Sequence, residues 1–158
     1  MAQNGSWYKY IRNKVIFRFA YLYSGCVVIN KYVGNVIFLT GDSMQPTIYD
    51  GDIVFTRSYN PRKHEINKND IVCVKSPTDA GILLCKRVAL VEHEYDNISF
   101  NNIRPSARIA AGHCFLLGDN LEASSDSRAF GPIPMGLIYS RVLFRVWPPN
   151  RIGFIEKY

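Results

Sequence analysis

A lysine in the middle of an apolar run is the first residue of this chain whose setting could support catalysis. The run Ile82–Val91 alternates as a strand would, and each of its two faces carries one cation, Lys86 or Arg87. A lysine among apolar neighbours has a lowered pKa, so its neutral amine can accept a proton, whereas an arginine stays protonated. Only Lys86 is therefore a candidate base. The structural alternative is an edge strand whose two cations reach solvent.

A base needs a nucleophile, and Ser43 lies where an apolar run, Val36–Thr40, breaks at a glycine shortly before Pro46. A serine at such a junction can expose its hydroxyl while its backbone N–H faces an incoming carbonyl, as an oxyanion hole requires. The alternative is an ordinary turn serine. The GxSxG and SxxK signatures are not matched around Ser43. A Ser-His-Asp triad would need one of three histidines that nothing nearby singles out: His64, His93 and His113.

A polar, turn-forming segment, Gly118–Pro134, supplies the third group of candidates. Asp126 and Arg128 are two residues apart, so in an extended chain they lie on one side and can form an ion pair. If the segment folds over a site, Ser124 can hydrogen-bond a lysine amine and orient it.

The elements that must position these residues are short β-rich runs separated by turn residues. Long periodic helices are missing after residue 35, which predicts a mainly β fold with several short strands in a barrel-like or coiled sheet. We assign residues 36–158 to this domain. The predicted strands are Val36–Thr40, Ile53–Arg57, Ile71–Lys75, Ile82–Val91, Ile98–Phe100, Cys114–Leu117 and Val142–Trp147.

Residues 1–35 differ from the rest of the chain in composition: they are basic at first and then hydrophobic. The net charge of +6 arises largely here, because five cations precede the first acidic residue, Asp42, and the rest of the chain is nearly neutral. A nucleic-acid-binding protein usually carries its basic face on the folded domain, so we expect no nucleic-acid partner. The five cations are Lys9, Arg12, Lys14, Arg18 and Lys31.

The hydrophobic part of this leader, Val15–Ile29, is interrupted by Arg18. Its longest charge-free stretch, Phe19–Asn30, is shorter than the about 18 residues of a confident membrane span. It is a short anchor with Arg18 at the lipid interface, a helix packed on protein, or an organelle-targeting sequence. We favour the membrane anchor.

The cysteines show no metal-ligand spacing and no CxxC motif, so we interpret them as small buried residues and expect neither a metal nor another cofactor. They are Cys26, Cys73, Cys85 and Cys114.

The three candidate segments, in this order, resemble the type I signal peptidase family, peptidase S26. The similar motifs are Gly41–Thr47, Asp50–Val54, Asn69–Val72, Lys86–Val88, Gly118–Asn120 and Ser124–Arg128. The later motifs Gly131–Pro134, Gly136–Ile138 and Arg141-Val142 further resemble the mitochondrial inner membrane branch of that family. The similarity runs from about Val33 to Pro148.

The resemblance implies an antiparallel β domain with a peptide-binding groove, in which Ser43 is the nucleophile and Lys86 the general base. It also implies that Ser124 orients Lys86 and that Asp126 and Arg128 form a supporting ion pair. The oxyanion-binding and substrate-binding positions implied by the same motifs are Gly41, Met44, Leu84 and Cys85.

Gly41 is a departure from the family pattern. Some bacterial relatives have a serine there that donates to the oxyanion, and glycine has no side chain to do so. The backbone N–H of Ser43 remains as one donor. The sequence does not identify the second donor.

As function, the resemblance implies a serine endopeptidase that removes sorting presequences from proteins delivered to the mitochondrial intermembrane space or inner membrane. The implied partners are presequence-bearing precursors, a related second subunit in a heterodimer, and the lipid bilayer through the N-terminal segment. The implied location is the inner membrane, with the catalytic domain facing the intermembrane space. The alternative is a non-catalytic, membrane-anchored subunit that keeps the fold to bind its partner.

Overall fold

A computed structural model of the chain describes residues 12–25, 34–95 and 108–155. Two compact units are distinguished, Met1–Gly34 and Asn35–Tyr158. In the first unit, residues 12–25 form a helix with exposed side chains. Among the described residues, none of the helices has both the length and the hydropathy needed to cross a membrane.

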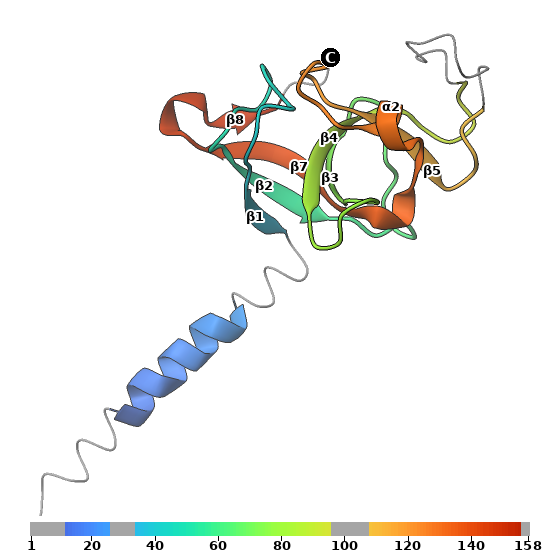
Figure 1. Cartoon of the computed structure of the whole chain (residues 1–158). Helices are drawn as coiled ribbons and strands as arrows, with labels where there is room; N and C mark the ends of the chain where they lie inside the picture. The colour runs from blue at the N-terminus through green and yellow to red at the C-terminus, as the bar shows by residue number, and fades with distance from the viewer. Residues whose placement is uncertain (1–11, 26–33, 96–107, 156–158) are drawn as a thin grey trace, which may run out of the picture. The chain divides into compact units, whose positions relative to one another are not determined.

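The second unit is built on one antiparallel sheet with the strand order β1-β2-β7-β3-β4-β5-β6, and β8 pairs with β7 (Figure 1). This confirms the predicted mainly β class. The strands are β1 (Asn35–Phe38), β2 (Ile53–Ser58), β3 (Ile71–Lys75), β4 (Leu83–Leu90), β5 (His113–Leu117), β6 (Ile133–Pro134), β7 (Ile138–Trp147) and β8 (Gly153–Phe154). The helical turns are α2 (Ser127–Phe130), η1 (Met135–Leu137) and η2 (Pro149–Arg151).

Each predicted strand within the described residues coincides with an observed one, and Ile98–Phe100 lies outside them. Strand β7 begins at Ile138, earlier than the predicted Val142, because the polar residues before Val142 hide its alternation. Strands β6 and β8 were not predicted, since two residues are too few to show a period.

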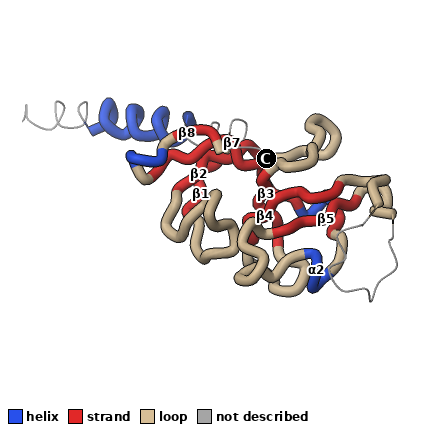
Figure 2. The backbone as a smooth tube through the Cα atoms, turned by 90° about the horizontal axis from the view of Figure 1, so that it is seen from above, coloured by secondary structure: helices blue, strands red, loops and turns tan. Residues whose placement is uncertain are grey.

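Strand β3 is at the centre of the core, because all four of its apolar residues, Ile71–Val74, are buried. Val72 and Val74 belong to one hydrophobic cluster, whereas Ile71 and Cys73 belong to another. The curled sheet thus covers both faces of β3. Strand β4 lies between β3 and β5, so it is an internal strand, and α2 lies against β5 (Figure 2).

A buried carboxylate ties the segment between β1 and β2 to the rest of the sheet. Asp52 is fully buried and forms ion pairs with Arg145 of β7, at 3.1 Å, and with Arg151 of η2, at 2.7 Å. It also accepts a hydrogen bond from the Tyr49 backbone N–H at 3.0 Å. A buried charge with this many partners fixes the position of its turn. The end of the segment that leads from Ser43 into β2 is therefore held to β7 and η2.

Candidate active site

Lys86 is buried on an internal strand. Its side chain is on the face of β4 that also carries Val88, directly opposite Val72 of β3, and the residue is only 3% exposed. Arg87 on the other face is 8% exposed. Both cations are thus buried, which excludes the edge-strand alternative, because strands pair with β4 on both sides.

Burial is the largest influence on the Lys86 amine, and it lowers the pKa of that group. The carboxylate of Asp126 acts in the opposite direction and raises the pKa, while the nearby Arg128 cation lowers it. The balance is a lysine that loses its proton more readily than an exposed one. Such an amine is suited to act as a base.

Ser43 lies in the turn that follows β1. Gly41 has a φ of +93°, a conformation that glycine adopts without strain, and its N–H donates to Asp50 Oδ1 at 2.8 Å. Asp42 accepts a hydrogen bond from Gln45 Nε2 at 2.6 Å, and the Ile48 N–H donates to the Met44 carbonyl at 2.8 Å. These local bonds shape a tight turn that leaves Ser43 partly exposed.

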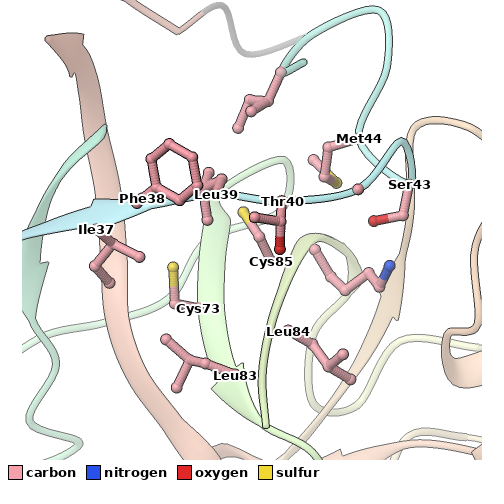
Figure 3. A pocket seen from close by; sticks show the side chains of 13 residues that line it. Ile37, Phe38, Leu39, Thr40, Ser43, Met44, Cys73, Leu83, Leu84 and Cys85 are labelled. Atoms are coloured by element: carbon pink, nitrogen blue, oxygen red, sulfur yellow. The ribbon is translucent and has the colours of Figure 1, made fainter. Parts of the chain in front are cut away.

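One pocket of about 130 Å³ brings the predicted nucleophile and base together (Figure 3). Ser43 and Lys86 both line it, as do the four residues predicted to bind the oxyanion or substrate: Gly41, Met44, Leu84 and Cys85. The other lining residues are Ile37, Phe38, Leu39, Thr40, Ile48, Cys73 and Leu83. No hydrogen bond between Ser43 and Lys86 is present in the described part of the chain. Hydrogen bonds between catalytic groups often tighten only when substrate binds.

The histidines considered as triad members do not reach this pocket. None of its lining residues is a histidine. His64 lines a different, smaller cavity, and His113 Nδ1 is 3.1 Å from the Ala111 carbonyl oxygen. The pocket therefore offers Lys86 as the base for Ser43.

The segment after β5 closes onto the turn that carries Ser43. The Asn120 N–H donates to the Ser43 carbonyl at 3.0 Å. A Cβ atom at Gly118 would come within 2.5 Å of that same carbonyl oxygen and of Ser124 Cβ. Only glycine allows the two segments to approach so closely.

Arg87 and Asp119 clamp the same two segments together, an interaction that the sequence reading missed. Arg87 Nε is 2.8 Å from Asp119 Oδ1 and Arg87 Nη2 is 2.7 Å from Oδ2, a bidentate pair. Asp119 also accepts a hydrogen bond from the Thr47 hydroxyl, and Arg87 Nη1 donates to the Asn69 carbonyl at 3.1 Å. The available signal was the second cation of the apolar strand, which must be paired if buried.

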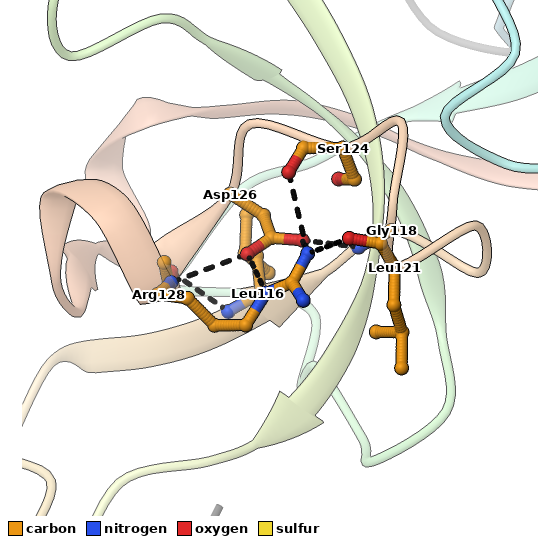
Figure 4. A network of polar contacts seen from close by, with 7 residues as sticks. Leu116, Gly118, Leu121, Ser124, Asp126 and Arg128 are labelled. Atoms are coloured by element: carbon orange, nitrogen blue, oxygen red, sulfur yellow. Dashed lines mark hydrogen bonds and ion pairs between the residues drawn. The ribbon is translucent and has the colours of Figure 1, made fainter. Parts of the chain in front are cut away.

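Asp126 and Arg128 form the predicted ion pair (Figure 4). Arg128 Nε is 2.8 Å from Asp126 Oδ1 and Nη2 is 3.0 Å from Oδ2. Asp126 is also the N-cap of α2 and accepts the Gly118 N–H at 3.0 Å. Burial acts to raise the pKa of Asp126, but the bonds from Arg128 and Gly118 outweigh it and lower the pKa. Asp126 therefore remains charged and locks the closing segment to the end of β5.

Ser124 lies beside this pair with a buried hydroxyl. Its Oγ is close enough to Asp126 to help lower the pKa of that carboxylate, but no described residue meets it at full hydrogen-bond geometry. A buried hydroxyl without a partner costs stability, so its retention suggests a use. The orientation of Lys86 by Ser124 stays a prediction.

A serine hydroxyl and a buried lysine amine in one pocket of an antiparallel β domain are the components of a serine peptidase that uses lysine as its base. The family model for signal peptidase, peptidase S26, matches residues 11–92 and 89–147. The chain belongs to this family, and the predicted class of activity, a serine endopeptidase, is confirmed at the level of the family.

Individual relatives support the same family assignment. The chain is 40% identical over 138 residues to mitochondrial inner membrane protease subunit 1 of Homo sapiens, covering 84% of this chain and 82% of that protein. It is 35% identical over 134 residues to mitochondrial ATP-independent inner membrane protease subunit 1a of Arabidopsis thaliana, covering 82% and 80%. It is 31% identical over 136 residues to mitochondrial inner membrane protease subunit 2 of Saccharomyces cerevisiae, covering 80% and 76%. These names support the mitochondrial inner membrane as its location.

Replacing Lys86 with methionine is expected to raise the free energy of unfolding, because methionine fills similar space without a charge that burial disfavours. Since burial lowers the pKa of Lys86 in the folded state, the unfolded state binds this proton more tightly. The stabilisation should therefore be largest near neutral pH and shrink as the pH rises toward 10.5, the ordinary value for lysine. Thermal unfolding at neutral and alkaline pH measures it, with about 2–4 °C in Tm for each kcal/mol.

The matched control is Lys75→Met, which removes an exposed lysine at the end of the neighbouring strand β3. We expect its Tm to stay close to wild type. A Tm of Lys86→Met no higher than that of Lys75→Met at neutral pH would contradict a desolvated amine at residue 86.

Proposed function

We propose that this chain removes sorting presequences from proteins delivered to the mitochondrial intermembrane space or inner membrane, with Ser43 as nucleophile and Lys86 as general base. The observation that carries the proposal is the shared pocket, in which a partly exposed serine meets a buried lysine of lowered pKa. Neither residue would suffice alone. The family membership is consistent with the same pair.

The mechanism follows from the chemistry of the two groups. Neutral Lys86 takes the proton of the Ser43 hydroxyl as its oxygen attacks the scissile carbonyl carbon. The protonated amine then gives that proton to the leaving nitrogen, and an acyl-enzyme on Ser43 remains. Neutral Lys86 next takes a proton from water, which attacks the ester and releases the new carboxyl end. Because the amine must be neutral twice in each turnover, its lowered pKa is central to the rate.

Three supporting residues tune the base in this proposal. Arg128 forms an ion pair with Asp126. Its positive charge therefore opposes the effect of the Asp126 carboxylate, which raises the pKa of Lys86. The buried Ser124 hydroxyl oxygen accepts a hydrogen bond from an N–H of the Lys86 amine, which orients the amine lone pair toward Ser43. Together they keep Lys86 pointed at the pocket rather than at Asp126.

The substrate is an extended presequence segment lying along the pocket beside β1 and β4. The apolar lining contributed by Leu84, Cys85 and Met44 suits an uncharged side chain close to the cut. Residues 1–35 anchor the chain to the inner membrane, and residues 36–158 face the intermembrane space. The relatives include subunits numbered 1 and 2, which supports a heterodimer with a related second subunit.

Cleavage of a presequence peptide by the full-length chain, reconstituted in lipid vesicles with and without the related second subunit, tests this function. Ser43→Ala and Lys86→Met should each lower kcat by about 10⁴-fold or more, because each removes a member of a cooperating pair. A serine-directed electrophile should label the wild-type protein and fail to label Ser43→Ala.

Ser58→Ala and Lys75→Met are the matched controls, since neither residue lines the pocket, and both should retain wild-type rates. Cleavage by Lys86→Met at the wild-type rate would show that Lys86 is not the general base. Labelling that persists in Ser43→Ala, with no cleavage of any presequence, would favour the non-catalytic subunit.

A second oxyanion donor is supplied, in this proposal, by the Thr40 hydroxyl. The Gly41 N–H is already bonded to Asp50, so it is not available to the oxyanion. Thr40 and Ser43 are the two hydroxyl-bearing residues that line the pocket, and Figure 3 shows both hydroxyls directed into it. The Ser43 N–H and the Thr40 hydroxyl would then stabilise the negative charge of the tetrahedral intermediate.

Thr40→Val keeps the side-chain shape and removes the hydroxyl, so it should lower kcat by about 10²-fold with little change in KM. Thr40→Ser keeps the donor and should retain most of the activity. Presequence cleavage under single-turnover conditions measures the difference. A kcat for Thr40→Val equal to wild type, or equal losses in the two variants, would remove Thr40 from the oxyanion hole.

A further inference from the structure

Two cysteines face each other in the wall of the catalytic pocket. Cys73 of β3 is directly opposite Cys85 of β4 in the antiparallel register, and both line the pocket that contains Ser43 and Lys86. Figure 3 shows both side chains there. Both are free thiols, and the mechanism uses neither.

The register brings these thiols within range of a disulfide bond. Residues directly opposite in antiparallel strands have Cα atoms about 4.5–5.5 Å apart. Disulfides join residues whose Cα atoms are about 4.4–6.8 Å apart. A Cys73–Cys85 bond therefore requires side-chain rotation and little movement of the two strands.

The surroundings make the two thiols unequal partners in such a reaction. The hydrogen bond from Cys85 lowers the pKa of Cys73, against the effect of burial, and the neighbouring Ser140 hydroxyl of β7 lowers it further. The same interaction with Cys73, together with burial, raises the pKa of Cys85. Cys85 is partly exposed, whereas Cys73 is fully buried. Cys85 is thus the thiol that an outside reagent can reach, and Cys73 is the better internal thiolate.

We propose that Cys73 and Cys85 form a reversible disulfide by exchange with a low-molecular-weight disulfide, and that the oxidised enzyme cleaves presequences more slowly. The regulatory half of this proposal rests on the proposed function of the pocket. The reactive pair is a modification site distinct from the Ser43–Lys86 pair but in the same wall.

The exchange balances in two steps. Cys85, the thiol that the small disulfide can reach, gives up its proton as its sulfur attacks one sulfur of that disulfide, which forms a mixed disulfide on Cys85 and releases one small thiolate. The Cys73 thiolate then attacks Cys85 Sγ and displaces the second small thiolate. Two cysteine thiols are oxidised, one small disulfide is reduced to two thiols, and the two cysteine protons pass to the departing thiolates.

The bond would act on catalysis through the pocket wall and through β4. Bonded sulfurs lie about 2.05 Å apart, much closer than unbonded thiols, so the wall beside the substrate changes shape. Cys85 is also the residue directly before Lys86. A change of one small group in an apolar pocket alters kcat/KM by about tenfold or more, and we expect a loss of that size.

The test uses the full-length chain with its second subunit in lipid vesicles, treated with oxidised glutathione and afterwards with dithiothreitol. Mass spectrometry of the digested protein should find a Cys73–Cys85 linked peptide after oxidation and not after reduction. Presequence cleavage should fall about tenfold in kcat/KM on oxidation and recover on reduction.

Cys85→Ala should lose sensitivity to the oxidant, whatever its basal rate. Cys73→Ala should stop at the mixed disulfide on Cys85, which mass spectrometry detects as a glutathione adduct without a linked peptide. Cys114→Ala is the matched control and should keep that sensitivity, because burial raises the pKa of Cys114 to about 12 and it does not line the pocket. All variants are made in a Cys26→Ala background, since Cys26 lies outside the described residues.

Three results would overturn the proposal: no linked peptide, a linked peptide with unchanged cleavage, or equal inhibition of Cys85→Ala and wild type. A linked peptide in a protein that is inactive even when reduced has a different meaning. It would contradict the proposed function, and with it the regulatory half of the proposal, while supporting the disulfide itself.

Discussion

The burial of one amine is the constraint on which the site depends. Lys86 lies on an internal strand with apolar neighbours, and this desolvation is what lowers its pKa. A buried cation would destabilise the fold severely if it were fully charged and had no neighbouring negative charge. The carboxylate of Asp126 lies near Lys86 and is itself held by an ion pair with Arg128. The result is a compromise. Asp126 is near enough to limit the destabilisation, and Arg128 keeps Asp126 from raising the pKa of Lys86 to the ordinary lysine value.

A desolvated base is useful only if a nucleophile is held beside it. The chain positions the proposed nucleophile, Ser43, by tying two distant segments together. The Asn120 N–H bonds the Ser43 carbonyl, and the absence of a side chain at Gly118 lets the segments touch. Arg87, the neighbour of Lys86 on β4, grips Asp119 in the same closing segment. One strand therefore supplies both the proposed base, on one face, and the clamp that positions the turn of the proposed nucleophile, on the other.

Much of this was visible in the sequence, because strand alternation and short spacings are local properties. The alternation of side chains along Ile82–Val91 predicted that at least one cation lies on an apolar face. The two-residue spacing of Asp126 and Arg128 predicted their ion pair. That both Lys86 and Arg87 are buried follows from the position of β4 between β3 and β5, which depends on strand order. The partnership of Cys73 with Cys85 likewise depends on register between strands. Such long-range pairing leaves no local pattern in a single sequence.

The most direct test of the account is the pKa of the Lys86 amine itself, measured by NMR titration of the full-length chain labelled at lysine Cε and Nζ. The Ser43→Ala variant prevents self-cleavage during the titration, and the spectrum of Lys86→Met identifies the signal by its loss. We expect the Lys86 amine to titrate below 10.5, the ordinary lysine value, because burial is its largest influence. A pKa at or above that value would mean that Asp126 dominates the site and that Lys86 is not its base.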